Sequence, residues 1–253
     1  MDDFGLLGYL ALFLTGGLAG FVDSIAGGGG LIALPVLLAF GVPAHQALAT
    51  NKLQSSFGSF TAATNYARRG LMRPKTLLAG VFHTFIGAVA GAASVRFFSA
   101  GFLETLIIFM LAAILIYNLL TPRLGLEPGP ARMAPQLFYL LAGLTLGFYD
   151  GFFGPGAGSF WTMALVFLAG LNLKTATAQT KLFNFTSNIV SLAVFASFGL
   201  VLWGAGLTMG VGQVAGAWAG STLASKREAR FIRYFFLAVT AATIAKLLWG
   251  RLA

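Results

Sequence analysis

The chain contains the stretch GFVDSIAGGGG at residues 20–30 and repeats a variant of it, GFYDGFFGPGAG, at residues 147–158. The aspartates of the two stretches, Asp23 and Asp150, lie 127 residues apart. Glycine destabilises a helix interior and permits backbone conformations closed to other residues. The two stretches therefore predict a helix that is broken at the same place in two related halves of the chain.

A second repeated stretch follows each of these at a similar distance. Residues 47–53 read ALATNKL and residues 176–182 read ATAQTKL, and their lysines, Lys52 and Lys181, lie 129 residues apart. The offset changes once, by two residues, which indicates a duplication with one short insertion. In an apolar chain, an internal duplication is typical of transporters whose site lies between two halves.

The composition indicates a membrane protein. Hydrophobic residues make up 58% of the 253 residues and charged residues only 9%, against about 25% charged in an ordinary soluble domain. The net charge of +9 comes from bases that cluster in short loops between apolar runs, so the predicted partner is the anionic face of a bilayer and not nucleic acid. The absence of cysteine excludes disulfides and thiol chemistry.

The predicted fold is an all-α polytopic integral membrane protein built from two repeats with Gly-rich helix breaks. A span takes about 20 residues, and the two short runs, 31–44 and 157–172, each follow a Gly-rich stretch. These runs either span the bilayer or re-enter it, so eight and ten spans both stay open. The apolar segments fall at 5–26, 31–44, 46–67, 76–97, 102–120, 136–153, 157–172, 175–198, 203–223 and 231–250.

The basic loops predict that the two repeats have opposite orientations in the membrane. The loop at residues 68–75 is basic and is predicted to be cytoplasmic, whereas in the second half the basic loop comes one helix later, at residues 226–233. Such a displacement is typical of inverted-topology repeats. We expect a first repeat at 1–120, a cytoplasmic linker at 121–135, a second repeat at 136–253, and both termini outside.

The Gly-rich breaks predict an anion site. Each break opens a new helix, whose first amides have no intrahelical partner and carry the positive end of the helix dipole. Exposed backbone at membrane depth is tolerated where it faces protein or a wet cavity. The alternative is that these glycines only allow close packing of helices. The glycines predicted to bind substrate are Gly28, Gly29, Gly30, Gly154, Gly156 and Gly158.

Two lysines are candidate ligands for the anion. Lys52 and Lys181 are predicted to lie about half a turn to one turn into apolar helices, where ionisable groups usually line a functional path. The alternative is that both side chains snorkel to the interface. Neutral polar residues on the same helices would supply further contacts to bound oxygens: Asn51, Gln54, Thr180, Asn184 and Asn188.

The aspartates and one histidine are candidates for proton coupling. Asp23, Asp150 and His83 could carry a coupling proton. Alternatively, each aspartate accepts hydrogen bonds from the broken helix or pairs with the lysine of its own repeat, and His83 is a buried, hydrogen-bonded residue. The chain has no recognisable zinc constellation, so no metal or other cofactor is expected.

The duplicated Gly-rich motifs, each followed by an A-x-A-x-x-K stretch, resemble those of the TauE/SafE family of sulfite exporters. The resemblance covers the chain from about Gly5 to Leu248. It implies export of small sulfur oxyanions or organosulfonates across the bacterial inner membrane by a multi-pass transporter, driven by an ion gradient with alternating access. Pro155 and Ala157 replace glycines of the first repeat, so the two anion sites are not expected to be identical.

Two other function classes compete with a carrier. A passive anion channel would use the same site chemistry without alternating access. An intramembrane enzyme would use Asp150 with Asp23, but neither aspartate lies in a Gly-x-Gly-Asp sequence, and Ser159 lacks the nucleophile-elbow spacing. The expected partners are a small anion and the lipid bilayer, not nucleic acid, and a homodimer is left open.

Overall fold

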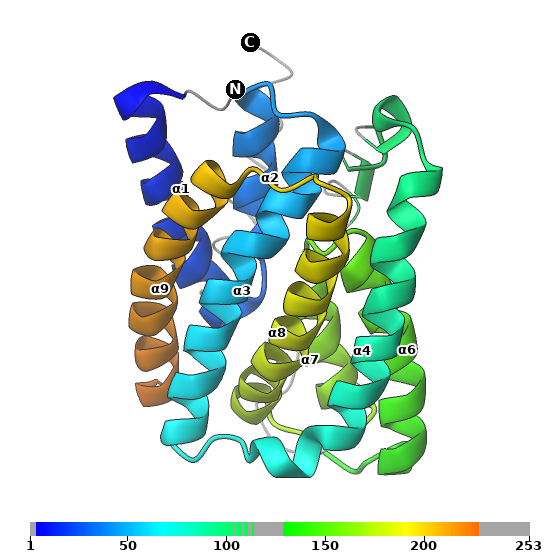
Figure 1. Cartoon of the computed structure of the whole chain (residues 1–253). Helices are drawn as coiled ribbons and strands as arrows, with labels where there is room; N and C mark the ends of the chain where they lie inside the picture. The colour runs from blue at the N-terminus through cyan, green and yellow to red at the C-terminus, as the bar shows by residue number, and fades with distance from the viewer. Residues whose placement is uncertain (1–3, 104, 108, 111–112, 114–128, 228–253) are drawn as a thin grey trace.

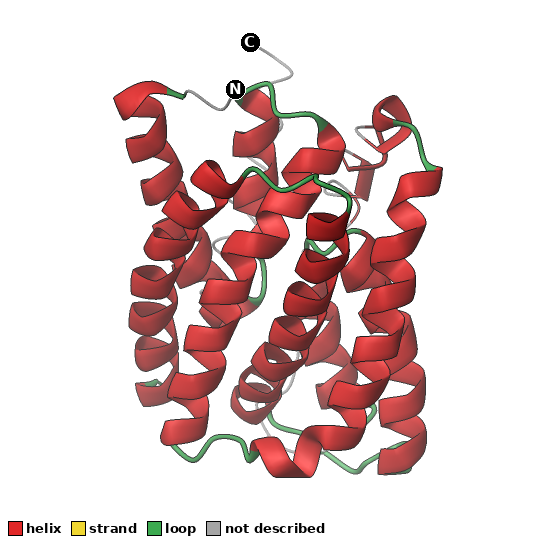
Figure 2. Cartoon of the chain, viewed as in Figure 1, coloured by secondary structure: helices red, strands yellow, loops and turns green. Residues whose placement is uncertain are grey.

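The computed structural model describes residues 4–227, except 104, 108, 111, 112 and 114–128. Within these residues every regular element is a helix (Figure 2), in agreement with the predicted all-α class. The expected segment 231–250, most of the segment 102–120 and most of the linker 121–135 lie outside the described residues.

The helices of the two halves correspond in order, and the central helices also correspond in length. In the first half they are α1 (Gly5–Ala26), α2 (Gly30–Ala39), α3 (Ala44–Arg68), η1 (Pro74–Leu77), α4 (Leu78–Ser94) and η2 (Val95–Phe97). In the second half they are α6 (Pro135–Phe152), α7 (Ala157–Phe167), α8 (Leu173–Ser197) and α9 (Trp203–Lys226). Helices α3 and α8 both have 25 residues, and their first residues are 129 positions apart.

The position of the two-residue insertion follows from these bounds. Helix α2 has 10 residues and α7 has 11, so one extra residue lies in α7. The other lies in the loop that follows, which runs over residues 40–43 in the first half and 168–172 in the second. The offset of 127 at the aspartates therefore becomes 129 at the lysines.

The two halves pack in the same way. Helix α1 lies along α9, α6 lies along α4, and α3 and α8 pack against each other between these pairs (Figure 1). Glycines allow the close approach, since a Cβ at Gly20 of α1 would lie 2.6 Å from the carbonyl oxygen of Gln213 in α9, and one at Gly147 of α6 would lie 2.7 Å from that of Thr84 in α4. Small residues are typical of helix contacts in membranes.

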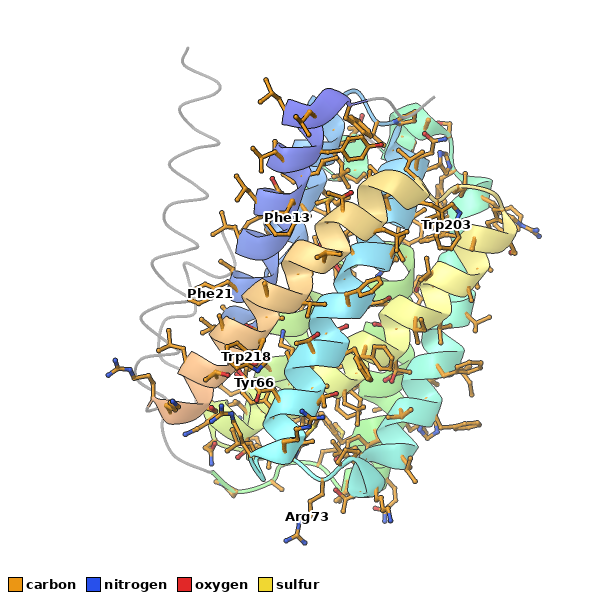
Figure 3. The ribbon with its side chains drawn as sticks, turned by 60° about the vertical axis from the view of Figure 1, so that its left-hand side comes forward. Phe13, Phe21, Tyr66, Arg73, Trp203 and Trp218 are labelled. Carbon is orange, nitrogen blue, oxygen red and sulfur yellow. The ribbon has the colours of Figure 1, made fainter. Side chains whose placement is uncertain are left out.

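Corresponding helices run in opposite directions. Helices α1 and α3 begin at the upper end of the molecule as drawn in Figure 1, whereas α6 and α8 begin at the lower end. The basic residues gather at that lower end, where α3 and α9 finish and α6 and α8 start; Figure 3 shows Arg73 there. The described basic residues of this end are Arg68, Arg69, Arg73, Lys75, Arg132, Lys174, Lys226 and Arg227.

Each broken helix returns to the end from which it came. At the upper end, the ring of Phe4 before α1 contacts the ring of Phe40 after α2, with centroids 5.5 Å apart. At the lower end, the N–H of Arg132 before α6 donates to the carbonyl of Leu168 after α7 at 2.9 Å. Of the two readings of the short segments, this geometry favours re-entrant hairpins over full spans.

Large apolar side chains cover the outer faces of the helices. Trp218 of α9 is 60% exposed (Figure 3), and Phe82 of α4 is exposed to the same extent. By length and composition, the segments Gly5–Ala26 and Pro74–Phe97 are long and apolar enough to cross a bilayer among the described residues. The outer surface is therefore suited to lipid and the polar residues lie inside.

Candidate functional site

The two helix breaks meet between the halves. A Cβ at Gly27 would lie 2.6 Å from the carbonyl carbon of Gly158, and one at Gly30 would lie 3.2 Å from Pro155. The hydroxyl of Ser159 donates to the carbonyl of Ala26 at 3.3 Å, which ties the start of α7 to the end of α1. The two breaks therefore cross in an antiparallel arrangement, which a side chain at Gly27 would prevent and one at Gly30 would disturb.

Positive φ angles explain why glycine is needed at the turns themselves. Gly27 has φ 78°, Gly154 has φ 98° and Gly156 has φ 76°. Other residues rarely adopt these conformations. Gly29, which is the counterpart of Gly156 at an offset of 127, has φ −56° and is helical. The two breaks thus differ in backbone conformation as well as in sequence.

A small polar cavity lies where the breaks meet. Its empty volume is about 330 Å³, part of which is open to solvent. Both breaks and both long central helices contribute to its wall. The lining residues are Asp23, Gly27, Gly29, Gly30, Asn51, Ser55, Asp150, Gly154, Gly156, Gly158, Asn184 and Asn188.

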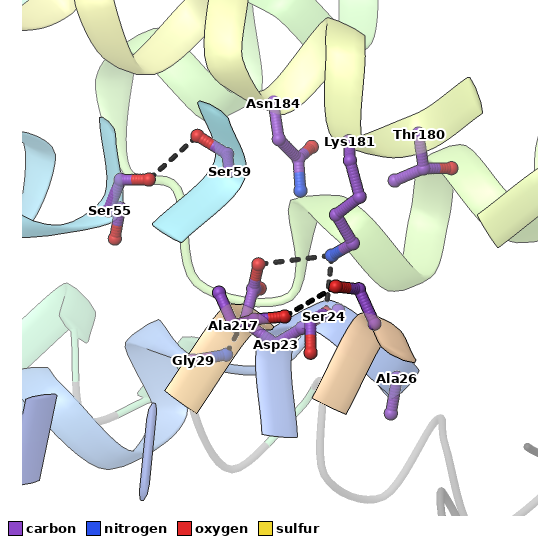
Figure 4. Close-up of polar contacts among 12 residues, drawn as sticks. Asp23, Ser24, Ala26, Gly29, Ser55, Ser59, Thr180, Lys181, Asn184 and Ala217 are labelled. Carbon is purple, nitrogen blue, oxygen red and sulfur yellow. Dashed lines mark hydrogen bonds and ion pairs between the residues drawn. The ribbon is translucent and has the colours of Figure 1, made fainter. Parts of the chain in front are cut away.

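Each lysine pairs with the aspartate of the other half. Lys52 Nζ lies 2.6 Å from Asp150 Oδ1, and Lys181 Nζ lies 3.0 Å from Asp23 Oδ2 (Figure 4). Each ammonium group also donates to the backbone carbonyl of the same aspartate. The expected alternatives, pairing within one repeat and snorkelling of the lysines, are therefore wrong for the described structure.

The lysines lie deeper in their helices than predicted. Lys52 comes eight residues after the start of α3, and Lys181 comes eight residues after the start of α8. At 1.5 Å per residue this is about 12 Å along each helix. The predicted segments, which begin at 46 and 175, already place each lysine six residues into its helix, so the predicted depth of one turn or less was too small, and the helices begin two residues earlier still, at Ala44 and Leu173.

The two ion pairs have different surroundings. We call Lys52–Asp150 the sealed pair, because its side chains are 1% and 4% exposed and Ser187 donates to the second oxygen of Asp150. We call Lys181–Asp23 the accessible pair, because Asp23 is 21% exposed and its second oxygen accepts one long hydrogen bond, 3.3 Å, from the N–H of Gly29. The two aspartates thus occupy equivalent positions in the duplication, but the contacts to the carboxylate of Asp150 are shorter and less exposed than those to Asp23.

Amide side chains line the cavity from both central helices. Asn51 of α3 and Asn184 of α8 are 3% and 5% exposed. The Oδ1 atom of Asn184 is buried and has no hydrogen-bond partner among the described residues, and Figure 4 shows this side chain pointing from α8 toward Asp23. Unpaired buried polar atoms are costly, so this oxygen indicates a place for a donor from a ligand or a water.

The cavity includes most of the predicted site residues. The glycines 29, 30, 154, 156 and 158 line it, as do Asn51, Asn184, Asp23 and Asp150. Asn188, which was predicted to contact bound oxygens, also lines the cavity, whereas two lining residues, Gly27 and Ser55, were not predicted to bind substrate. Ser55 could have been found from the duplication, because it lies 129 positions before Asn184.

Other predicted residues lie outside the cavity. Gln54 donates to Asn51 at 2.8 Å and accepts from Gln213, so it joins α3 to α9. Thr180 bonds to Thr162 of α7 at 3.1 Å. The residues in this group are Gly28, Lys52, Gln54, Thr180, Lys181 and His83, and the two lysines reach the cavity only through the carboxylates that they hold.

His83 belongs to a helix contact and not to the cavity. Its Nδ1 atom lies 2.8 Å from the carbonyl oxygen of Ala79 in the same helix. Its Cβ atom faces Gly143, where α4 packs against α6. The structural alternative for His83 is thus supported in its hydrogen bond but not in its burial, because the side chain is half-buried, and neither ion pair contacts it.

Comparisons with known proteins identify a family and several relatives of this chain. The family model described as "Sulfite exporter TauE/SafE" matches residues 12–247. The chain is 45% identical over 238 residues to the probable membrane transporter protein YfcA of Escherichia coli strain K12, covering 94% of this chain and 88% of that protein. It is 43% identical over 245 residues to the probable membrane transporter protein ORF9 of a Sinorhizobium species, covering 97% and 93% of the two chains.

A third relative covers almost the full length of both chains. The probable membrane transporter protein of Haemophilus influenzae strain Rd is 37% identical over 249 residues, or 98% of each chain. No solved structure gives a significant match.

Proposed function

This chain belongs to the sulfite exporter TauE/SafE family, and from that membership we propose that it exports small sulfur oxyanions or organosulfonates across the bacterial inner membrane. Its relatives are named as probable membrane transporters, so the chain is a probable membrane transporter. The observation that carries the substrate proposal is the central cavity, where two helix starts from the two halves meet beside two buried lysines.

The helix starts favour an anion over a cation. Gly30 begins α2 and Gly158 is the second residue of α7, and both line the cavity. Some amides at these starts already make local bonds, such as that of Ser159 to the carbonyl of Gly156, so the amides left for a ligand are those of Gly30 and Gly158, at the positive ends of the helix dipoles. Amide side chains of α3 and α8 add neutral donors. A small tetrahedral or pyramidal oxyanion can accept several such bonds at once.

The charges around the cavity favour a singly charged ligand. Lys52 and Lys181 are matched by Asp150 and Asp23, so the four ionised groups sum to zero. Bringing a charge into a low-dielectric site is costly unless it is compensated. A monoanion such as hydrogen sulfite or an organosulfonate therefore needs less compensation than a dianion such as sulfate.

Alternating access is supported by the arrangement of the halves. Corresponding helices follow the same order and run in opposite directions, and the central pair, α3 and α8, is equal in length, as expected for inverted-topology repeats. The two ion pairs both join one half to the other, at levels about 12 Å from opposite ends of the central helices. We propose that rocking of the halves about the crossed breaks exposes the cavity to each side in turn, driven by an ion gradient.

The orientation proposal places the basic end of the molecule in the cytoplasm. Eight described basic residues lie at that end, and cytoplasmic loops carry an excess of lysine and arginine. The start of α1 lies at the opposite end, so the N-terminus is proposed to be periplasmic, as is the C-terminus. Reporter fusions at Ala253 test this: strong activity from a reporter that works only in the cytoplasm would contradict the assignment.

Transport by the purified protein in sealed vesicles tests the substrate and the mechanism. Vesicles loaded with unlabelled sulfite should accumulate labelled sulfite above its external concentration, because a carrier exchanges one anion for the other. A passive channel would give equilibration without accumulation, and an enzyme would give a changed product. If sulfite, thiosulfate, sulfoacetate and methanesulfonate neither exchange nor raise the melting temperature of the protein, the substrate proposal is wrong.

A further inference from the structure

The carboxylate of Asp23 occupies the place where an anion would bind. Its Oδ1 atom accepts the N–H of Gly29 at the start of α2, and its Oδ2 atom lies 3.0 Å from Lys181 Nζ. We propose that Asp23 is an internal anion that competes with the transported anion, so that each anion bound takes up one proton on Asp23. This inference rests on the proposed function, because it assumes that the cavity binds an anion.

Binding then keeps the cavity neutral. Without a ligand, the sealed pair and the accessible pair have no net charge. A monoanion adds one negative charge, and a proton on the Asp23 carboxylate removes one, so the sum returns to zero. The protonated carboxyl no longer needs the ammonium group of Lys181 or the N–H of Gly29. Both donors become available to the ligand in the same step.

Asp23 fits this role better than Asp150 does. Asp150 is 4% exposed, and Lys52 and Ser187 hold its two oxygens. Asp23 is 21% exposed, and its contact with Gly29 is long. A proton and a ligand can therefore reach Asp23 from the cavity, whereas Asp150 keeps its partners and its charge.

The charged and titratable groups near Asp23 are few. Lys181 faces it from α8, and Tyr66 of α3 lies close by, with its hydroxyl donating to the carbonyl of Ser24 at 2.7 Å. Asp150 lies on the cavity wall with its partner Lys52. Helices α2 and α7 contain no titratable residue, and the part of α9 that packs along α1 presents only neutral side chains among the described residues.

Asn184 is a second and independent indication of a ligand. Its Oδ1 atom is an unused, buried acceptor on the same cavity wall. The O–H of a protonated Asp23 is a donor that needs an acceptor in this region, and the ionised carboxylate has no such donor. The cavity therefore already holds an acceptor that a protonated Asp23 can use and an ionised Asp23 cannot.

Methanesulfonate is a suitable probe, because it keeps its single charge from mildly acid to neutral pH. Wild-type protein should bind it more tightly as the pH falls, by a factor that approaches about tenfold per pH unit for the uptake of one proton. Calorimetry in two buffers of different ionisation enthalpy should report the same uptake directly. The Asp23→Asn variant should bind with an affinity that does not depend on pH.

His83→Gln is the matched control, because His83 bonds to its own helix and contacts neither ion pair. It should keep both the affinity and the pH dependence of the wild type. Binding by the wild type without proton uptake, or a pH dependence that persists in Asp23→Asn, overturns the internal-anion proposal alone. If neither methanesulfonate nor sulfite binds the wild type at any pH, the proposed function itself is wrong.

Discussion

The sealed pair and the accessible pair are built from the same residue types in repeated sequence, yet they leave their carboxylates in different states. Asp150 has both oxygens held by side chains and is nearly inaccessible, whereas Asp23 is one-fifth exposed and is held on one side by a backbone amide. Duplication of a motif therefore does not duplicate its chemistry. The residues around each motif decide which copy is structural and which can react.

One position explains most of this difference. Ser187, which donates to Asp150, corresponds to Gly58 in the first half at the offset of 129. A side chain at Gly58 would displace the amide end of Gln213, because its Cβ would lie 2.9 Å from the Cδ atom of Gln213. Gln213 in turn corresponds to Thr84, a smaller residue. The two halves have thus diverged together at the contact between a central helix and its outer neighbour.

Replacing the two lysines should give the largest difference in stability between the sealed pair and the accessible pair. Lys52→Gln leaves a buried carboxylate without its charge partner, which costs about 3–5 kcal/mol of unfolding free energy. Lys181→Gln should cost about 1–3 kcal/mol, because the cavity can hydrate Asp23. Denaturant titration of the detergent-solubilised protein measures both losses of unfolding free energy. The double variant Lys52→Gln with Asp150→Asn should recover most of the loss, and equal losses for the two single lysine variants would contradict the distinction.

Alanine at the equivalent break glycines should separate stability from binding. Gly156→Ala places a side chain at φ 76°, which costs roughly 1–2 kcal/mol of stability. Gly29→Ala keeps a helical backbone, but its Cβ would lie 2.9 Å from the Cβ of Asp23. We therefore expect Gly29→Ala to change the affinity for methanesulfonate more than it changes the melting temperature. The reverse result would mean that Gly29 is only a packing residue.

Ser187→Ala should make the sealed pair resemble the accessible pair. The loss of one hydrogen bond to a charged group should lower stability by about 1 kcal/mol or somewhat more. One oxygen of Asp150 then has no side-chain donor, so a second proton can bind and the pH dependence of methanesulfonate affinity should become steeper. An unchanged pH profile together with unchanged stability would show that Lys52 alone determines the state of Asp150.

His83→Gln should have the smallest effect. The imidazole bonds to its own helix and contacts neither pair. We expect a change in stability within about 0.5 kcal/mol and a normal pH dependence of sulfite exchange in vesicles. A variant that exchanges sulfite without pH dependence would restore His83 as a proton relay.

The long helices could be predicted from the sequence, and the short ones only in part. The predicted segment 46–67 corresponds to the helix Ala44–Arg68, and the predicted segment 175–198 corresponds to the helix Leu173–Ser197. The segment 31–44 ends early, at Ala39, because Gly41 has φ 77° and Pro43 precedes the next helix. The sequence shows both Gly41 and Pro43, but the predicted end of this segment followed the continuous apolar run to residue 44.

The ion pairs could not be assigned from the sequence. Each lysine had two candidate aspartates, and local spacing favours neither, because the partners are 98 and 158 residues apart. Their choice depends on the crossing of the two breaks, which is a contact between distant parts of the chain. The roles of Gln54 and Thr180 were missed for the same reason, since their partners lie on α9 and α7.

Because each ion pair joins one half of the chain to the other, its two members are synthesised at different times. Asp150 is synthesised 98 residues after Lys52, and Lys181 is synthesised 158 residues after Asp23. At about 5–20 residues per second, the first lysine waits roughly 5–20 s for its partner. During that interval the translocation machinery or its lipids must shelter an unmatched ammonium group. A nascent chain arrested before Asp150 should therefore be a good substrate for membrane quality-control proteases, and one arrested after Lys181 should resist them.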